Sequence, residues 1–432
     1  GQLYIREALE KGAVAVLCRR APDFDGPWLM AEDPRAALAL ISANWFGHPA
    51  EALTCVAVTG TNGKTTTTYL LKAALEGALH AKVGLIGTNQ NMIGEEALPA
   101  HRTTPESYEL QELLRAMADA GCTHVVMEAS SIALVLHRTG GIRFAAGIFT
   151  NLTPDHLDFH GTMEAYRTAK GLLFDQTDLA VVNLDDDAGR YYAESAPCPV
   201  FTYSERKDEA DLVAKNIRLF PSHVEFEAVA RNTIGRIFLP IPGGFSIYNA
   251  LGVVACALNL GAGLPDIAAA LRSARGVKGR VEVVPVPAAY TVIIDYAHTP
   301  DALTNVLNGI DEVLNGRGRI ITVVGAGGNR DKGKRPLMAK EAAKLSDQVI
   351  LTSDNPRFED IINDMVAGLS KADMERTLCI TDRMQAIKTA AMLAKKGDVI
   401  LVAGKGHEDY QEVKGVKHHF DDREVIRNIF NS

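Results

Sequence analysis

A short apolar run, a glycine-rich loop and a helix follow one another near residue 60, and this succession constrains the fold most. Residues 54–58 predict a buried strand, and from Lys64 onward apolar side chains recur at helical spacing. The loop between them reads Gly60, Thr61, Asn62, Gly63, Lys64, Thr65, Thr66. Glycines let backbone N–H groups converge on an anion, and a helix N-terminus adds partial positive charge. The pattern predicts a phosphate-binding loop for ATP, in which Lys64 reaches the outer phosphates and the Thr65 hydroxyl binds magnesium.

The spacing of this loop differs from the usual one. Val58 occupies the position five residues before Gly63, where a further glycine is normally found, so the loop is a shortened variant. The loop by itself indicates only nucleotide binding, because kinases, GTPases, motors and ligases share it.

Strand-like and helix-like segments alternate along the whole chain. This alternation predicts an α/β fold with parallel sheets covered on both faces. We expect three domains, covering residues 1–51, 52–277 and 278–432, with a nucleotide-binding central sheet and a Rossmann-like C-terminal domain. The predicted strands are Thr54–Val58, His124–Met127, Ala146–Phe149, Ala180–Asn183, Val292–Ile294, Ile320–Val324, Gln348–Leu351 and Val399–Val402.

Composition narrows the functional classes. The formal net charge of -8 argues against a general nucleic-acid binder, which would be basic. No apolar run reaches the roughly 18 residues of a membrane span, and no signal peptide is recognisable. The six cysteines form no C-x-x-C pair. We therefore expect a cytoplasmic protein whose cysteines are small core residues.

Further polar motifs follow the loop in the central part of the chain. They are 101–105 (His-Arg-Thr-Thr-Pro), 128–131 (Glu-Ala-Ser-Ser), 151–160 (Asn-Leu-Thr-Pro-Asp-His-Leu-Asp-Phe-His) and Lys170 on a helix beginning near Met163. Glu128 and His156 are candidate magnesium ligands, although magnesium prefers oxygen. Each of these residues alone has an ordinary structural interpretation, such as a hydrogen-bonded histidine or a solvated lysine.

Taken together, in this order and spacing, these motifs resemble the Mur ligases of peptidoglycan synthesis, most of all those that add the third residue of the stem peptide. The resemblance extends from residue 1 to the C-terminus. It implies that Lys170 is carbamylated and binds a second magnesium ion together with Glu128 and His156, with Lys64 as the fourth catalytic residue. It also implies that Thr103, Thr104, Ser130 and Arg138 bind the UDP-sugar-peptide substrate.

The C-terminal part carries four polar motifs, each directly after a predicted strand. Because parallel strands end at one edge of a sheet, all four should face the same crevice. Arg330 and Arg357 can each form a fork with a carboxylate, while Asp354 and Glu408 can accept from an ammonium. These two cations and two anions could bind a zwitterionic ligand that carries an extra carboxylate. Alternatively, they form a network of surface ion pairs.

The resemblance gives this C-terminal set specific roles. Residues 354–357, Asp-Asn-Pro-Arg, match the family's motif for meso-diaminopimelate. The implied amino-acid-binding residues are Asp354, Asn355, Pro356, Arg357, Arg330, Gly404 and Glu408. The residues implied to lie near ATP are Asn249, Arg280, Asp295 and His298.

The sequence departs from the family pattern at a few points. Ile132 stands where the family has His, Leu136 where it has Gln, and Asn329 where it usually has Asp. The loss of the glutamine removes a polar contact expected for the substrate. The first residues match the interior of the family's uridine-binding domain, so we expect roughly the first half of that domain to be missing.

These observations lead to one functional prediction and two alternatives. We expect an ATP- and Mg²⁺-dependent ligase, acting as a monomer, that adds meso-diaminopimelate to UDP-N-acetylmuramoyl-L-alanyl-D-glutamate through an acyl phosphate. One alternative is a lysine-adding or folylpolyglutamate-type ligase. The other is a nucleotide-binding relative without catalytic activity.

Overall fold

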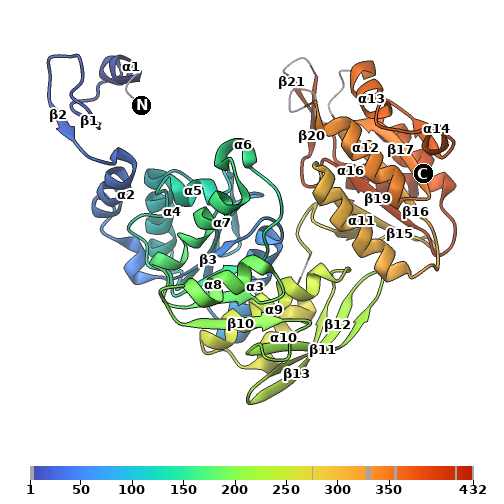
Figure 1. The fold of residues 1–432 in the computed structure, drawn as a ribbon, viewed down its shortest axis with the longest axis horizontal. Helices are drawn as coiled ribbons and strands as arrows, with labels where there is room; N and C mark the ends of the chain where they lie inside the picture. The colour runs from blue at the N-terminus through green and yellow to red at the C-terminus, as the bar shows by residue number, and fades with distance from the viewer. Residues whose placement is uncertain (1–3, 275, 327–331, 355–357, 414–415, 431–432) are drawn as a thin grey trace. The chain divides into compact units, whose positions relative to one another are not determined.

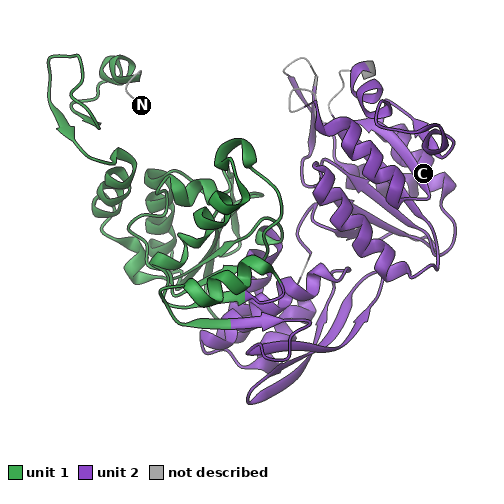
Figure 2. Ribbon diagram, viewed as in Figure 1, with its two compact units in different colours: residues 1–64, 80–182, 186–201 green, residues 65–79, 183–185, 202–432 purple. Residues whose placement is uncertain are grey.

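The structure is a computed structural model that describes residues 4–274, 276–326, 332–354, 358–413 and 416–430. The chain divides into two compact units (Figure 2). Unit 1 holds residues 1–64, 80–182 and 186–201, and unit 2 holds residues 65–79, 183–185 and 202–432. Of the described residues, none belongs to a helix long and apolar enough to cross a membrane.

Unit 1 is built on mainly parallel strands that follow one another in the order β10-β9-β8-β3-β7-β4-β5-β6, as part of an 11-stranded sheet (Figure 1). The ladder from β9 to β4 is parallel, so β8, β3 and β7 end at one edge. The strand bounds are β3 (Thr54–Thr59), β4 (Val83–Ile86), β5 (Asn91–Ile93), β6 (Glu96–Leu98), β7 (His124–Glu128), β8 (Ala146–Phe149), β9 (Ala180–Asn183) and β10 (Val200–Ser204).

The helices of unit 1 cover this sheet with apolar faces. On α4, Leu110, Leu114 and Met117 recur at helical spacing and share a core with Ala57 of β3 and Met127 of β7. The remaining elements are α1 (Ile5–Glu10), β1 (Val16–Cys18), β2 (Trp28–Met30), α2 (Pro34–Trp45), η2 (Pro49–Ala52), α4 (Ser107–Asp119), α5 (Ser131–Val135), α6 (Leu157–His160), α7 (Met163–Gly171), η3 (Phe174–Gln176) and α8 (Asp187–Ser195).

Unit 2 contains a helical and antiparallel part and a second sheet. The first part comprises α3 (Lys64–Leu79, from Thr65 on), β11 (Leu212–Leu219), β12 (Val224–Ala230), β13 (Thr233–Leu239), α9 (Phe245–Asn259) and α10 (Leu264–Ser273). The second sheet has the order β14-β15-β19-β16-β17-β18. Its strands are β14 (Glu282–Val284), β15 (Thr291–Asp295), β16 (Ile320–Ala326), β17 (Gln348–Ser353), β18 (Thr377–Cys379) and β19 (Val399–Ala403).

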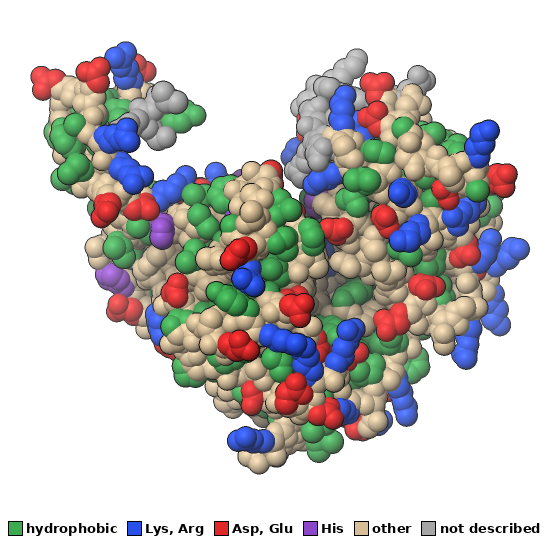
Figure 3. Space-filling model, in the orientation of Figure 1, with side chains coloured by type: hydrophobic (Ala, Val, Ile, Leu, Met, Phe, Trp, Pro, Cys, Tyr) green, Lys and Arg blue, Asp and Glu red, His purple; other side chains and the backbone are tan. Residues whose placement is uncertain are grey.

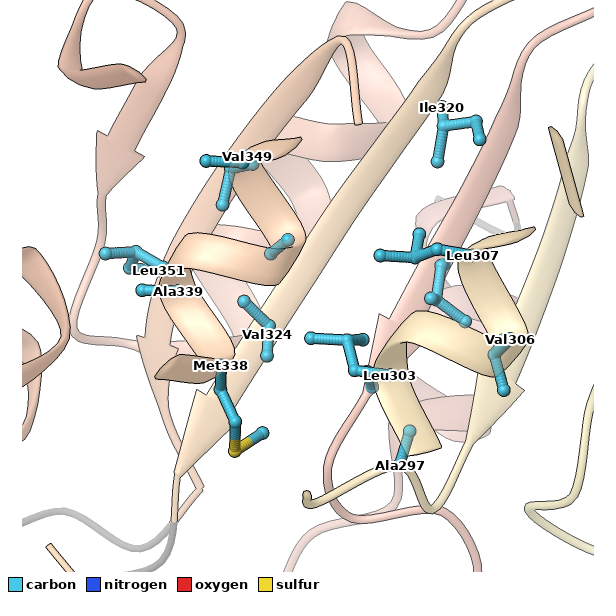
Figure 4. Packing of buried hydrophobic residues seen from close by; sticks show 14 of the residues in the cluster. Ala297, Leu303, Val306, Leu307, Ile320, Val324, Met338, Ala339, Val349 and Leu351 are labelled. Carbon is cyan, nitrogen blue, oxygen red and sulfur yellow. The ribbon is translucent and has the colours of Figure 1, made fainter. Parts of the chain in front are cut away.

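This second sheet is buried on both faces, as a parallel sheet requires. Leu303 and Leu307 of α11 and Met338 of α12 pack on one face with Val324 and Leu351 (Figure 4). Helices α15 and α16 cover the other face. The bounds are α11 (Pro300–Leu314), α12 (Lys334–Leu345), α13 (Phe358–Val366), α14 (Lys371–Met374), α15 (Arg383–Leu393), β20 (Tyr410–Val413), β21 (Val416–His419) and α16 (Asp422–Phe430).

All eight predicted strands are present, and the predicted α/β fold with parallel sheets is confirmed, but the sheets also contain antiparallel strands that the sequence analysis did not predict. Strands β11 to β13 form an antiparallel meander, and β5, β6 and β14 also pair in antiparallel fashion. The connection from β12 to β13 holds only Arg231 and Asn232, too few residues for the crossover that a parallel pair needs.

The charged surface and the cysteines agree with a folded, globular protein of mixed charge. Acidic and basic side chains are interspersed over the face of each unit in Figure 3. The structure describes all six cysteines as thiols outside disulfide bonds, and four of them are buried, as predicted for core residues. Cys379 is an exception, because it is exposed on β18 at the edge of its sheet, and Cys198 is half-buried.

The core beneath α11 allows a stability test. Leu307 is fully buried, whereas Leu337 on α12 is 52% exposed. Leu307→Ala should lower the free energy of unfolding by about 2–5 kcal/mol, because it removes buried methyl groups and leaves a cavity. Leu337→Ala should change it by less than about 0.5 kcal/mol. Urea titrations of both variants measure this difference, and equal effects would contradict the assigned core.

Candidate active site

The phosphate loop is shaped by two glycines between β3 and α3. Gly60 and Gly63 have φ angles of 147° and 85°, which residues with side chains rarely adopt. A Cβ atom on Gly60 would lie 1.9 Å from the Thr150 hydroxyl, so that position has room only for glycine. Helix α3 begins at Lys64, which directs the N-terminus of the helix at the loop.

The lysine of the loop is folded back onto it. The Lys64 Nζ atom donates to the carbonyl oxygens of Gly60 and Thr61, at 2.9 Å each. In unit 2, Thr65 is buried near the start of α3 and Thr66 is half-buried. The residues predicted to bind phosphate thus form one continuous loop and first helical turn.

Glu128 ends β7 as a buried carboxylate, only 1% exposed. Its oxygens accept hydrogen bonds from the Thr88 amide at 2.8 Å and the Thr88 hydroxyl at 3.0 Å. The Thr88 hydroxyl also lies 3.0 Å from that of Thr103. These contacts satisfy a charge that would otherwise be costly to bury.

The four residues predicted to hold the substrate gather at this end of β7. The Thr104 hydroxyl donates to the Glu128 carbonyl at 2.8 Å and accepts from the Ser130 amide at 3.1 Å. Arg138 donates to the Thr104 carbonyl at 3.0 Å and pairs with Glu106 at 2.7 Å. With Thr103 beside Thr88, the structure brings all four together, although they lie up to 35 positions apart in the sequence.

Lys170 of α7 lies beneath the phosphate loop, 1% exposed. Its Nζ atom donates to the Gly60 carbonyl at 2.9 Å and lies 4.3 Å from the centre of the Tyr166 ring. Burial, and then the charge of Lys64, hold the pKa of Lys170 well below its usual range, while Asp155 opposes this shift. A lysine in this setting is held toward its neutral amine form.

His156 stands apart from these buried groups. It adopts a left-handed conformation, with φ of 51°, between Asp155 and the short helix α6. Its side chain is 48% exposed and lies 3.6 Å from the Asp155 carboxylate, and its ring centre is 6.3 Å from that of Tyr166. Tyr166 is thus the shared neighbour of His156 and Lys170.

The side chains predicted to bind the second magnesium ion fit that role if Lys170 is carbamylated. Within the part of the chain that the structure describes, no three His, Cys, Asp or Glu side chains are grouped to hold a metal ion. Glu128 supplies anionic oxygen, but the amine of Lys170 does not. Carbon dioxide reacts with a neutral amine, so the lowered pKa of Lys170 favours formation of a carbamate. The carbamate would add two oxygen atoms to the possible magnesium ligands.

Three of the four residues predicted near ATP gather in unit 2 around Tyr296. The guanidinium of Arg280 lies 4.8 Å from the Tyr296 ring centre, and the His298 ring lies 4.6 Å from it. Asp295 accepts from the amides of Val281 at 2.7 Å and Ala297 at 2.8 Å, and burial raises its pKa against the charge of Arg280.

Asn249, the fourth of these residues, lies on α9. Its side-chain oxygen accepts from the Thr67 hydroxyl at 3.3 Å. Neither Tyr296 nor its other ring neighbour, His407, whose ring centre lies 4.9 Å away, was among the predicted site residues.

The residues predicted to bind the amino acid are described only in part. Arg330, Asn355, Pro356 and Arg357 lie outside the described residues. Asp354 ends the segment after β17, and a Cβ atom on Gly404 would lie 2.7 Å from its carboxylate. The Glu408 carboxylate lies 3.6 Å from the buried Lys405 Nζ atom. The strands before these motifs are neighbours in one parallel ladder, as predicted.

Arg383 holds this region together, and the sequence analysis missed it. Its side chain is fully buried and pairs with Asp354 and Asp422, at 2.7 Å each. It also donates to the Ala403 carbonyl at 3.1 Å, directly before Gly404. Burial raises the pKa of Asp354 to about 6, even though Arg383 lowers it. No local pattern around Arg383 could have revealed partners 20 to 39 residues away.

Comparison with known families decides the classification of this chain. The family model described as Mur ligase middle domain matches residues 58–257, and the one described as Mur ligase, glutamate ligase domain matches residues 279–406. A relative from Parabacteroides distasonis, named UDP-N-acetylmuramoyl-L-alanyl-D-glutamate--2,6-diaminopimelate ligase, is 54% identical over 100% of this chain and 90% of that protein. The chain belongs to the Mur ligase family.

Other Mur ligases extend this similarity. A relative with the same name from Bacteroides fragilis is 49% identical over 100% of this chain and 90% of that protein. Another, from Clostridium botulinum, is 44% identical over 99% of this chain and 89% of that protein. A solved structure of a diaminopimelate ligase with that name has a TM-score of 0.72 at 33% identity, covering 100% of this chain and 89% of that one. A folylpolyglutamate synthase from Mycobacterium tuberculosis, at 15% identity and a TM-score of 0.68, shares the fold alone.

The Arg383 ion pairs lead to a second stability prediction. Arg383→Met should lower the free energy of unfolding by about 3–5 kcal/mol, because it leaves Asp354 and Asp422 buried without their cation. Arg143→Met removes an exposed pair with Asp178 and should cost no more than about 1 kcal/mol. Chemical denaturation measures both, and a similar small loss in each variant would contradict the structural role of Arg383.

Proposed function

We propose that this Mur ligase is an ATP-dependent amide ligase. It adds meso-diaminopimelate to UDP-N-acetylmuramoyl-L-alanyl-D-glutamate during peptidoglycan synthesis. The observation that carries this proposal is the 54% identity, over the whole of this chain, to a relative named for that reaction. The residues proposed as catalytic in this reaction are Lys64, Glu128, His156 and Lys170.

The first chemical step takes place at the phosphate loop. A carboxylate oxygen of the substrate attacks the γ-phosphorus of ATP, the bond to the β-phosphate oxygen breaks, and ADP leaves. Lys64 and the N–H groups at the start of α3 stabilise the charge that spreads over the transferred phosphoryl group. A solved MurF ligase of this fold, from Thermotoga maritima, is described in complex with ADP, which supports nucleotide use here.

Magnesium, when bound, would offset phosphate charge and orient the phosphates. Thr65 would hold one magnesium ion, and Glu128, His156 and carbamylated Lys170 would hold a second. Carbamylation joins the Lys170 nitrogen to the carbon of carbon dioxide, and the nitrogen releases a proton to solvent. The buried position of Lys170, under the Gly60 carbonyl and beside Lys64, supports this modification by disfavouring the ammonium form.

The second step forms the amide. The amine of diaminopimelate attacks the acyl carbon, inorganic phosphate leaves, and the amine loses a proton. Thr103, Thr104, Ser130 and Arg138 would hold the UDP-linked substrate, since they gather at the end of β7 beside Glu128. The amino acid would be bound by Asp354, Gly404 and Glu408 together with Arg330, Asn355, Pro356 and Arg357, and Asn249, Arg280, Asp295 and His298 would contact ATP.

The choice of amino acid gives the main test of this function. We expect amide product with meso-diaminopimelate, and at least about a hundredfold lower kcat/KM with L-lysine, which lacks the distal carboxylate that an arginine would bind. The assay supplies the UDP-dipeptide, ATP and each amino acid in turn. Preference for L-lysine or L-glutamate would overturn the specificity, and phosphate release independent of both co-substrates would indicate a non-ligase.

Lys170 gives a second functional prediction. Lys170→Ala should lower the rate of amide formation by about 10²–10³-fold, because it removes the anionic oxygens that the carbamate supplies. Short carboxylates such as propionate should restore part of this rate by supplying such oxygens. Lys215→Ala removes an exposed lysine paired with Asp208 and should leave the rate unchanged. An active Lys170→Ala enzyme without added carboxylate would contradict the assigned role.

A further inference from the structure

The segment that follows β8, residues 150–153, runs directly beside the phosphate loop. The loop itself contains two glycines with positive φ, and such residues have the most conformational freedom to lose. A loop of this composition keeps one shape only if other groups hold it. The contacts of residues 150–153 show what holds it.

Asn151 binds both polar backbone groups of one loop residue. Its side-chain oxygen accepts from the Asn62 amide at 2.9 Å, and its side-chain nitrogen donates to the Asn62 carbonyl at 3.1 Å. Its own backbone carbonyl accepts from the Thr61 amide at 2.8 Å. Asn151 thus binds the three successive peptide units of the phosphate loop from Gly60 to Gly63.

The threonines on either side of Asn151 add to this attachment. The Thr150 hydroxyl donates to the Asn62 carbonyl at 2.7 Å, and the Asn62 side chain donates to the Thr153 hydroxyl at 3.3 Å. The Thr61 hydroxyl accepts from the Thr153 amide at 3.0 Å. All of these hydrogen bonds join residues 61–62 of the phosphate loop to residues 150–153.

Residues 150–153 are themselves attached to neighbouring elements at two points. At one end the Thr150 amide continues the β3–β8 pairing by donating to the Thr59 carbonyl at 3.0 Å. In the middle the Leu152 amide donates to the carboxylate of Asp186, which caps α8, at 2.9 Å. The loop is therefore held against a segment that is itself fixed at two points.

We infer that Asn151 is a positioning residue for nucleotide binding, whose amide side chain preorganises the phosphate loop for the phosphates of ATP. Because the Asn62 amide is hydrogen-bonded to Asn151, the loop's contacts to phosphate come from the N–H groups that follow it, from Gly63 onward. A loop held in advance loses less conformational entropy when it binds, and so binds more tightly. The inference rests on the nucleotide binding contained in the proposed function.

Asn151→Ala tests this role. Removing both side-chain hydrogen bonds to Asn62 should raise the Kd and KM for ATP on the order of tenfold. The KM values for the UDP-dipeptide and the amino acid should stay unchanged, because the residues proposed to bind those substrates lie outside this loop. The affinity for inorganic tripolyphosphate, measured by competition with ATP, should fall by the same factor, because the loop acts on the phosphates.

Two further variants separate positioning from general stability. Asn151→Asp keeps the acceptor for the Asn62 amide but places an oxygen against the Asn62 carbonyl, so it should not restore ATP affinity. Asn259→Ala removes a side-chain bond to the Ala255 carbonyl, 2.8 Å long, on α9. It should lower the Tm without changing the KM for ATP.

The outcomes are distinct. Unchanged ATP and tripolyphosphate affinity in a folded Asn151→Ala protein would overturn the inference and leave the proposed function intact. A similar loss of affinity for ATP, the UDP-dipeptide and the amino acid in Asn151→Ala would also overturn it, because general destabilisation would then explain the effect. Wild-type protein that binds no ATP would instead overturn the proposed function.

Discussion

The carbonyl oxygen of Gly60 accepts hydrogen bonds from two lysines, and the candidate active site depends on this arrangement. The Nζ atoms of Lys64 and Lys170 each lie 2.9 Å from that oxygen. Two ammonium groups within about 6 Å of each other repel, and one of them is almost fully buried, so the buried one is held toward its neutral form. The glycine is what allows this, since a side chain at residue 60 would collide with Thr150. Backbone geometry thus sets the chemistry available to Lys170.

The cost of burying a charge also governs the C-terminal sheet in unit 2. The Arg383 side chain is fully buried, and the ion pairs with Asp354 and Asp422 offset the cost of burying its charge. The pairing ties the end of β17 to the end of β19 through the Ala403 carbonyl. The motif predicted to recognise diaminopimelate begins at Asp354, so this ion-pair network fixes where that motif starts.

Local patterns were enough to predict much of this molecule, but contacts between distant residues were not. Apolar β-branched runs predicted all eight strands, and the loop from Gly60 to Thr66 predicted the turn into α3, because these features depend on neighbouring residues. The antiparallel strands β11 to β13 were missed, since the short connections that decide their direction have no strong sequence signal. Asn151 was noticed only as part of a motif, and Arg383 not at all. Their roles arise from partners that folding brings close, and hydrogen-bond partners across a sheet leave no trace in spacing.

The proposed function depends on activation of a substrate carboxylate by phosphoryl transfer. The direct measurement uses UDP-dipeptide labelled with ¹⁸O in the side-chain carboxylate of its D-glutamate. Attack of that carboxylate on ATP, followed by attack of the amine on the acyl carbon, predicts one ¹⁸O atom per turnover in the released phosphate, detected by mass spectrometry. Released phosphate without ¹⁸O, alongside amide product, would contradict the acyl phosphate and with it the assigned function of the phosphate loop.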